Sequence, residues 1–240
     1  MIYQADLHTH TVASGHADNT VEEMIEAAVR RGITLYGITD HSIMMPGTCP
    51  KEYFEQLDDL KQEYNGIEVL YGVELNIMDY KGSVDMETEL LKNMDIAIAS
   101  IHNGIGYTSG SIAENTSAVT GAIENPYVNI IGHMDDDNIP VDYETVINAA
   151  IENHTLLEIN NNSLTENCWR KNTRKNIEKI IELCMKNNYP VVIGSDAHCI
   201  GNVGRNKESL EFLKKSGFPD ELILNYYPER LKTFMNKYRE

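Results

Sequence analysis

The chain is poor in positive charge: its 240 residues include 20 lysines and arginines against 37 aspartates and glutamates, for a formal net charge of −17. This balance argues against a nucleic-acid-binding protein, which needs a basic surface to meet the phosphate backbone. It does not fix the charge of a local site, because bound divalent cations can create an anion-binding site in an acidic protein.

Signals for membrane insertion and secretion are lacking as well. No apolar run approaches the roughly 20 residues that a membrane helix needs. The N-terminal MIYQADLHTH has no basic region followed by an apolar stretch. The four cysteines form no Cys-x-x-Cys pair, which favours reduced thiols over a disulfide framework. We therefore expect a cytoplasmic protein with no membrane partner.

Several catalytic motifs are absent. The sequence has no Gly-x-Ser-x-Gly elbow of the kind found in serine hydrolases. It also has neither the Gly-x-x-x-x-Gly-Lys-Ser/Thr phosphate loop nor the Gly-x-Gly-x-x-Gly dinucleotide fingerprint. These absences argue against a serine nucleophile of that class and against nucleotide cofactors.

The segments that are present alternate between strand and helix. Strands are predicted at Ile2–Leu7, Thr34–Thr39, Ile67–Val73, Asp95–Ile101, Val128–Gly132, Leu156–Ile159 and Pro190–Ser195. Helices are predicted at Val21–Arg31, Pro50–Tyr64, Met86–Lys92, Ser111–Glu124, Asp142–Asn153, Thr173–Lys186, Lys207–Ser216 and Pro228–Lys237. This alternation implies parallel pairing, and seven strands in a row favour a barrel, with residues 1–240 as one domain.

Metal-binding types of side chain stand where these strands end. They are seven of the eight histidines and two carboxylates, namely His8, His10, His16, His41, Glu74, His102, His133, Asp196 and His198. In such barrels the site forms at the C-terminal ends of the strands. Imidazole and carboxylate bind zinc, manganese and iron, and nine ligands are too many for one ion. The pattern predicts two or three ions held together, which is the chemistry of phosphoester and amide hydrolysis. The eighth histidine, His154, is expected to be structural.

Two pairs of these ligands have the two-residue spacing that places side chains on one face of a strand. The pairs are His8 with His10 and Asp196 with His198. Asp6 lies one step back on the face of His8, so we expect it to accept an N–H from a ligating histidine. For Asp40, beside His41, we favour a similar supporting role over that of a ligand or a loop cap.

Candidate substrate contacts come from the sixth and seventh strands. The sixth strand lacks a ligand and ends in the amides of Asn160 and Asn161, which could bind substrate or form turns. An arginine near a metal cluster suits phosphate binding. Among the arginines after these strands we favour Arg205 over Arg170 and Arg174.

The motifs resemble those of the PHP (polymerase and histidinol phosphatase) family. The residues that carry the resemblance are Asp6-Leu7-His8-Thr9-His10, Thr39-Asp40-His41, Glu74, Ser100-Ile101-His102, Gly132-His133 and Gly194-Ser195-Asp196-Ala197-His198. The Glu158-Ile159-Asn160-Asn161 stretch is similar to the small stand-alone bacterial phosphatases of that family. The resemblance spans almost the whole chain and implies a distorted TIM-like (βα)7 barrel with three metal ions.

The resemblance also implies how the ligands divide among three divalent ions, for which we favour Zn²⁺ over Mn²⁺ and Fe²⁺. The implied sets are His8, His10, Glu74 and Asp196 for the first ion, Glu74, His102 and His133 for the second, and His16, His41 and His198 for the third. Glu74 would bridge two ions. We further expect Glu74, Asp196 and His198 to act in catalysis.

We expect a metal-dependent phosphatase that hydrolyses small phosphomonoesters with a metal-activated hydroxide. Histidinol-phosphate phosphatase is the alternative within this class, because the ligand set fits both. A nuclease is disfavoured by the charge of −17. A non-enzymatic metal-binding protein is disfavoured because no ligand position is replaced. The sequence leaves the oligomeric state and the acid for the leaving group open.

Overall fold

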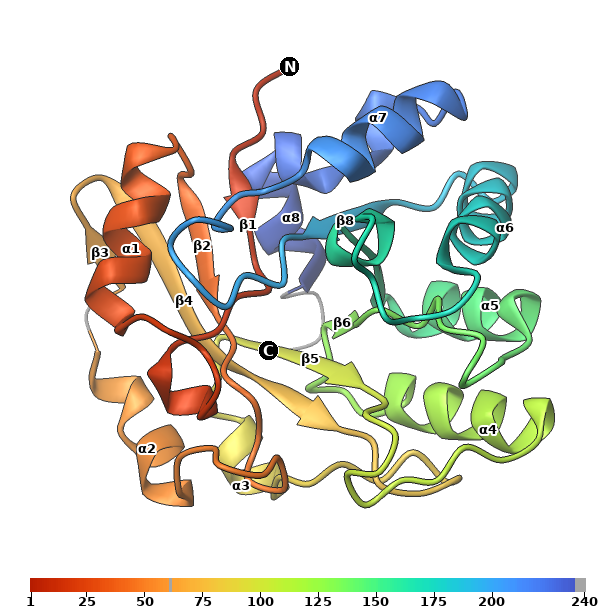
Figure 1. The fold of residues 1–240 in the computed structure, drawn as a ribbon, viewed down its shortest axis with the longest axis horizontal. Coiled ribbons are helices and arrows are strands. Elements are labelled where there is room, and N and C mark those ends of the chain that lie inside the picture. Colours follow the sequence, from red (N-terminus) through yellow and green to blue (C-terminus); the bar gives the residue numbers. More distant parts are fainter. Residues whose placement is uncertain (61, 236–240) are drawn as a thin grey trace.

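The computed structural model describes residues 1–60 and 62–235, in which strands and helices alternate (Figure 1). The parallel strands are β1 (Ala5–Asp6), β2 (Leu35–Ile38), β4 (Ile67–Asn76), β5 (Ile96–Ser100), β6 (Ile130–Ile131), β7 (Leu156–Asn160) and β8 (Val191–Gly194). The helices are α1 (Val21–Arg30), α2 (Lys51–Glu55), α3 (Thr88–Leu91), α4 (Ile112–Ile123), α5 (Tyr143–Asn153), α6 (Thr173–Lys186), α7 (Lys207–Lys215) and α8 (Pro228–Met235). None of these described helices is both long and apolar enough to cross a membrane.

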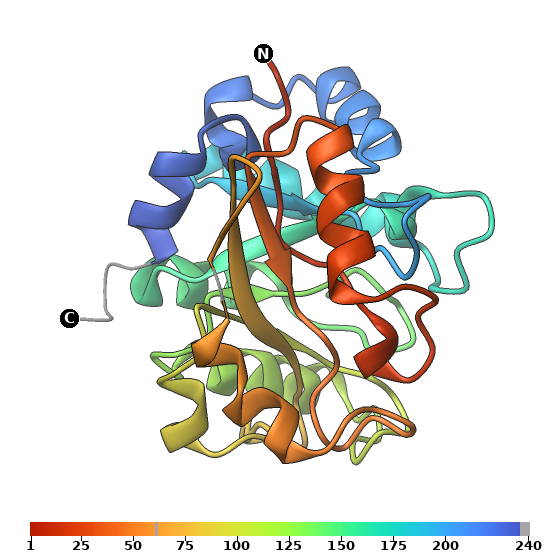
Figure 2. The same cartoon turned by 90° about the vertical axis from the view of Figure 1, so that its left-hand side faces the viewer.

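The seven parallel strands form one curved sheet in the order β1-β2-β4-β5-β6-β7-β8. A short strand, β3 (Glu63–Tyr64), pairs antiparallel with the start of β4. Thr9 and Ala197 form an isolated parallel bridge that brings the two edges of the sheet together. Helices lie around the outside of the strands (Figure 1, Figure 2). The predicted distorted (βα)7 barrel is confirmed.

Asn225 holds the seam between β1 and β8. Its side-chain oxygen accepts the Ile193 N–H at 2.7 Å. Its side-chain nitrogen donates to the Ala5 carbonyl at 2.9 Å and to the Ile193 carbonyl at 2.8 Å. Asn225 is fully buried. Its side chain supplies the hydrogen-bond partners that the buried backbone groups of the two edge strands would otherwise lack. A side chain thus completes the closure of the barrel.

The inward face of β7 shows how the sequence positions polar groups at the mouth of the barrel. Successive side chains of a strand point to opposite faces. Leu156 belongs to the apolar cluster inside the barrel, and Glu158 and Asn160 follow it at two-residue steps. Leu157 and Ile159 belong instead to the larger cluster that includes the helices. Apolar layers therefore fill the base of the barrel, and polar side chains fill its mouth.

One predicted helix is wrong in its second half. The prediction ran over Pro50–Tyr64, whereas α2 ends at Glu55. Asn65 and Gly66 have positive φ angles of 50° and 83°, and this tight turn folds β3 back onto β4. Strand pairing here overrides the helical spacing. The predicted helix Pro228–Lys237 extends past α8 into residues 236–240, which lie outside the described part of the chain.

Candidate metal centre

The predicted ligands meet at the mouth of the barrel. Glu74 lies on β4 itself, near its C-terminal end. The other eight lie on segments that follow β1, β2, β5, β6 and β8, and they are His8, His10, His16, His41, His102, His133, Asp196 and His198. Parallel strands present all their C-terminal ends at one rim, so residues distant in sequence come together here.

Glu74 is the centre of the group, and its carboxylate is fully buried. Each of its oxygens faces several histidine nitrogens. The distances from Oε1 are 2.9 Å to His133 Nε2, 3.3 Å to His8 Nε2 and 3.4 Å to His102 Nε2. The distances from Oε2 are 2.8 Å to His41 Nδ1 and 3.5 Å to His10 Nε2. Five imidazole rings therefore surround one carboxylate.

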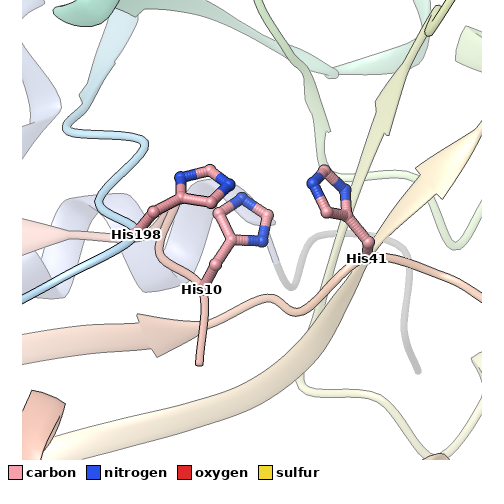
Figure 3. A group of neighbouring side chains, drawn as sticks. All are labelled: His10, His41 and His198. Carbon is pink, nitrogen blue, oxygen red and sulfur yellow. The ribbon is translucent and has the colours of Figure 1, made fainter. Parts of the chain in front are cut away.

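A second group contains only histidines. His10, His41 and His198 come from three different segments, and their ligand atoms lie within 4.8 Å of one another (Figure 3). The more exposed His16 extends this group, because its Nε2 lies 3.2 Å from the Nε2 of His198. Asp196 Oδ1 lies 3.5 Å from His10 Nε2. His10 thus belongs to the histidine group and also contacts both carboxylates, Glu74 and Asp196.

A hydrogen bond on the far side of His8 fixes which ring nitrogen faces the centre. Its Nδ1 lies 2.7 Å from Glu158 Oε1. An ionised carboxylate only accepts hydrogen bonds, so Nδ1 carries the proton. Nε2 is then the nitrogen that faces the centre, and it can present a lone pair to a metal ion when the ring is neutral.

His10 is oriented in the same way through Ser14. The Ser14 hydroxyl donates to Asp40 Oδ1 at 2.6 Å, so its oxygen is left to accept from His10 Nδ1 at 3.1 Å. Asp40 also accepts the Thr11 N–H at 2.6 Å and the Tyr53 hydroxyl at 2.7 Å. Asp40 therefore supports the predicted ligand His10 indirectly, through the hydroxyl of Ser14.

Asn76 orients His102. The Asn76 amide nitrogen donates to Asp85 Oδ2 at 2.7 Å, which leaves the amide oxygen to accept from His102 Nδ1 at 2.8 Å. His198 Nδ1 similarly lies 3.0 Å from the Asp196 carbonyl. Both rings thereby turn Nε2 towards the centre, and such outer partners make imidazole a stronger ligand.

Buried polar atoms without partners mark the middle of the centre. Among the described residues, His8 Nε2, His10 Nε2, His41 Nδ1 and Glu74 Oε2 are buried and make no hydrogen bond. Each orphaned atom of this kind costs about 1–3 kcal/mol, so atoms that face one another need a common partner. Imidazole nitrogens and carboxylate oxygens are ligands of borderline divalent metals, and the donor set fits such ions.

The charges of the centre oppose one another. Burial raises the pKa of Glu74, but the surrounding rings, His8 foremost, outweigh burial and hold that pKa well below its usual value. Burial likewise raises the pKa of Asp196, and His8 again leads the groups that bring it well below normal. Burial and the neighbouring His41 lower the pKa of His10. Burial lowers the pKa of His8, but the surrounding carboxylates outweigh burial and raise that pKa well above its usual value. A metal ion bound there would displace the proton, because metals bind neutral imidazole and ionised carboxylate.

Two of the predicted ligands have strained backbone. His133 has a φ of 24° and Asp196 a φ of 53°, a region that costs about 1–3 kcal/mol for residues other than glycine. The His133 N–H donates to Glu158 Oε2 at 2.9 Å, and Asn160 Nδ2 donates to Asp196 Oδ2 at 3.2 Å. These bonds hold the strained residues in place, and such strain is concentrated at functional sites.

Glu158 is the supporting residue that the sequence analysis did not assign to the site. It is buried on β7 and binds both the His8 ring and the His133 backbone. A Cβ atom on Gly194 would lie 1.8 Å from Glu158 Oε1, so glycine there leaves room for the carboxylate. The sequence could have indicated this role. Glu158 lies two residues before Asn160, on the inward face of β7, which carries no predicted ligand.

Asp6 has partners other than the expected ones. Its carboxylate accepts the Ser195 N–H at 3.1 Å and the Gly204 N–H at 2.7 Å. Both bonds go to the backbone around β8, and neither goes to a ligating histidine as the sequence analysis expected. The His8 ring meets Glu158 instead. Burial raises the pKa of Asp6 to about 6. Asp6 therefore anchors the segment that carries Asp196 instead of orienting a ring.

The predicted substrate contacts on the last strands are engaged with other protein groups. Asn160 Nδ2 donates to Glu158 and Asp196. Asn161 donates to Glu208 Oε2 at 2.9 Å. Arg205 also pairs with Glu208, with its Nη2 2.9 Å from Oε1. Asn161 and Arg205 thus meet at the start of α7.

A pocket of about 420 Å³ lies over the histidines. Its walls include Glu74, Asp196 and His198, together with the loop between β7 and α6. Arg170 belongs to that loop, is almost buried, and places its Nη2 3.2 Å from Asp196 Oδ2. Arg170 therefore stands where the sequence analysis expected Arg205.

Comparisons with known proteins show the family to which the chain is related. The model of the family described as PHP domain matches residues 6–191. A probable phosphatase of Thermoanaerobacter sp. (strain X514) is 39% identical over 232 residues, which cover 97% of this chain and 94% of the relative. A probable phosphatase of Caldanaerobacter subterraneus is 40% identical over 235 residues, which cover 98% of this chain and 92% of the relative.

Solved structures are similar in fold. The histidinol phosphate phosphatase of Lactococcus lactis, in complex with zinc, L-histidinol and phosphate, has a TM-score of 0.63 at 15% identity, over 91% of this chain and 95% of that one. The putative histidinol phosphatase of Listeria monocytogenes has a TM-score of 0.62 at 16% identity, over 86% of this chain and 99% of that one. At these identities the likeness concerns the fold alone.

Proposed function

The chain belongs to the PHP domain family and is a phosphoric ester hydrolase, and on this premise we propose that it cleaves small phosphomonoesters at a trinuclear metal centre. The observation that carries the proposal is the environment of Glu74. Five histidine nitrogens lie within 3.5 Å of its buried carboxylate. A tetrahedral site takes four ligands, so one ion does not account for this many donors together with Asp196 and the outer histidines.

We assign the nine side chains to three ions, with Zn²⁺ favoured over Mn²⁺ and Fe²⁺. The proposed sets are His8, His10, Glu74 and Asp196, then Glu74, His102 and His133, and finally His16, His41 and His198. The compact groups in the structure overlap these sets without matching them, because Glu74 and His133 group with His8, Glu74 and His102 group with His41, and His41 and His198 group with His10. His16 joins the third set through its contact with His198. The first set is supported by Asp196 Oδ1, which lies 3.9 Å from His8 Nε2 and 3.5 Å from His10 Nε2. The second is supported by the contacts of Glu74 Oε1 with both of its histidines.

Divalent ions bound there would lower the pKa of water to about 7 and offset the charge of the phosphoryl oxygens. The protein's own groups supply position. Arg170 has five N–H donors, and its bonds to Asp196, Asn160 and Ser163 leave donors for a phosphoryl oxygen. We assign catalysis to Glu74, Asp196 and His198, because all three line the pocket in which the phosphoryl group would bind.

Metal content and activity test this proposal together. Elemental analysis of the purified protein gives the number of ions per chain, and a generic phosphomonoester is assayed before and after chelation. Close to three ions per chain with chelator-sensitive release of phosphate supports the proposal. One ion or none, with no activity restored by zinc, manganese or iron, contradicts it.

Histidinol phosphate is the first natural ester to assay, because histidinol-phosphate phosphatase is the narrower alternative. The two solved structures of similar fold carry that activity in their names. A kcat/KM for histidinol phosphate far above the values for other small phosphomonoesters would favour the narrower activity. Comparable values across the set would favour a general phosphatase.

A further inference from the structure

An exposed tryptophan stands in the wall of the pocket over the metal centre. Trp169 is the only tryptophan of the chain. Its side chain is 71% exposed, and it lines the pocket together with Glu74 and His198. An indole offers a large apolar surface for a partner, and large apolar side chains exposed at a concave site are typical of binding surfaces. Trp169 therefore has the position of a ligand contact.

The loop that carries Trp169 is anchored on both sides of the indole. Before it, Asn162 donates to the Asp196 carbonyl at 3.0 Å. After it, the Lys171 N–H donates to Asp136 Oδ1 at 2.9 Å. The segment that exposes the indole is thus held at both ends. A surface held in its binding position costs less entropy when a ligand binds.

Arg170 connects the indole to the metal centre. Its Cζ lies 5.4 Å from the centroid of the Trp169 ring, which is a cation–π contact. Its Nη2 lies 3.2 Å from Asp196 Oδ2. The indole is therefore two contacts from a proposed metal ligand. A phosphoryl group beside Arg170 places its own leaving group next to Trp169.

The remaining lining of the pocket favours a flat leaving group. Met45 is the other large apolar side chain in the lining, and most of the rest are histidines, carboxylates and small polar residues. A volume of about 420 Å³ accommodates a phosphate and one ring. An aromatic ring against an indole gains more than its buried area alone provides, whereas an aliphatic group gains only the area term.

We propose that Trp169 is the specificity-determining residue and stacks against an aromatic ring in the leaving group of the phosphomonoester. The inference rests on the proposed phosphatase function and names its substrate class as phosphate esters of alcohols that carry a flat ring. The metal centre and Arg170 hold the phosphate end, and Trp169 holds the ring. Water takes the phosphoryl group, and the ring-bearing alcohol leaves with a proton.

Three esters with similar leaving groups isolate the effect of the ring. These are 2-phenylethyl, 2-cyclohexylethyl and ethyl phosphate, each of which releases a primary alcohol. We expect the wild type to prefer the phenylethyl ester. Trp169→Ala should lower kcat/KM for that ester roughly tenfold more than for ethyl phosphate, with the difference mainly in KM. Trp169→Phe should keep most of the preference.

Ile112→Ala is the matched control, because Ile112 is 54% exposed and lies outside the pocket lining. It should behave as the wild type with all three esters. An equal loss for all three esters in Trp169→Ala would point to a general effect through Arg170 and would overturn the proposal. A wild type that does not prefer the phenylethyl ester would overturn it as well.

Fluorescence gives a second readout that does not need turnover, because Trp169 is the only indole in the chain. The zinc-loaded protein is titrated with 2-phenylethylphosphonate and with ethylphosphonate, which are not hydrolysed. We expect a saturable change of emission with the first and little change with the second. If no phosphomonoester is cleaved with zinc, manganese or iron, the proposed function fails, and the titration alone tests whether Trp169 stacks on a ring. A saturable change of emission with the phenylethyl compound only then supports stacking. The absence of such a change overturns the stacking proposal.

Discussion

His16 and His198 face each other with their Nε2 atoms 3.2 Å apart, although 182 residues separate them along the chain. His16 follows β1 and His198 follows β8, which are the two edge strands of the sheet. The Thr9–Ala197 bridge and the side chain of Asn225 join the same two edges. The candidate metal centre therefore lies across the seam of the barrel, where a shared ion would connect both edges.

Metal removal is expected to destabilise the fold. A ligand that binds only the folded state adds about 4 kcal/mol of stability at 1,000 times its Kd. For a domain of this size, each kcal/mol corresponds to roughly 2–4 °C in Tm. Calorimetry before and after chelation should show a fall of about 8–16 °C that zinc reverses. An unchanged Tm after demonstrated loss of metal would contradict a centre that ties the seam.

His10→Ala is expected to lose metal and activity together. His10 Nε2 lies 3.5 Å from carboxylate oxygens of both Glu74 and Asp196, so its loss removes a donor at their junction. Outer partners of ligands alone account for roughly 10–100-fold in metal affinity or activity, so we expect kcat/KM to fall by more than about 100-fold. Elemental analysis and a phosphomonoester assay on the same sample measure both effects.

His154→Ala is the control for that variant. His154 ends α5 in a left-handed conformation, and its ring contacts Phe234, with centroids 6.1 Å apart. It lies outside the candidate centre, as the sequence analysis expected. Metal content and turnover should remain at wild-type values. Normal turnover by a metal-depleted His10→Ala protein would refute the assignment of His10.

Glu158→Gln is expected to weaken metal binding while the fold persists. Glu158 accepts from His8 Nδ1 through Oε1, and from the His133 N–H and Asn160 through Oε2. Glutamine has the same shape, but its NH₂ group is a donor. It would therefore face another donor, either at His8 or at His133 and Asn160, and one of these hydrogen bonds would be lost. We expect a loss of roughly 10–100-fold in metal affinity, measured by competition with a chromogenic chelator. Glu152→Gln, on the exposed side of α5, should bind metal as the wild type does.

The alternation of elements and the ligand positions could be predicted because both are local properties of the sequence. The prediction for Thr173–Lys186 matches α6 at both ends. Each predicted ligand stands at or after an apolar run, so the parallel barrel alone was enough to gather them at one rim.

Contacts between distant segments could not be predicted in the same way. Glu158 meets His8 across 150 residues, and nothing near either residue indicates the partner. Arg170 and Arg205 both follow strands, and local sequence does not show which loop folds over the pocket. Glu208, three residues after Arg205, is the neighbour that draws Arg205 away.

Asn225→Ala is expected to loosen the seam of the barrel. The change leaves the Ile193 N–H and the Ala5 carbonyl without their buried partner, and each orphaned group costs about 1–3 kcal/mol. We expect the free energy of unfolding to fall by about 3 kcal/mol, measured by chemical denaturation of the metal-free protein. Asn187→Ala is the control, because Asn187 is exposed and bonds the Leu183 carbonyl within its own helix, so its effect should stay within about 0.5 kcal/mol. An Asn225→Ala protein as stable as the wild type would mean that the Thr9–Ala197 bridge and packing alone close the barrel.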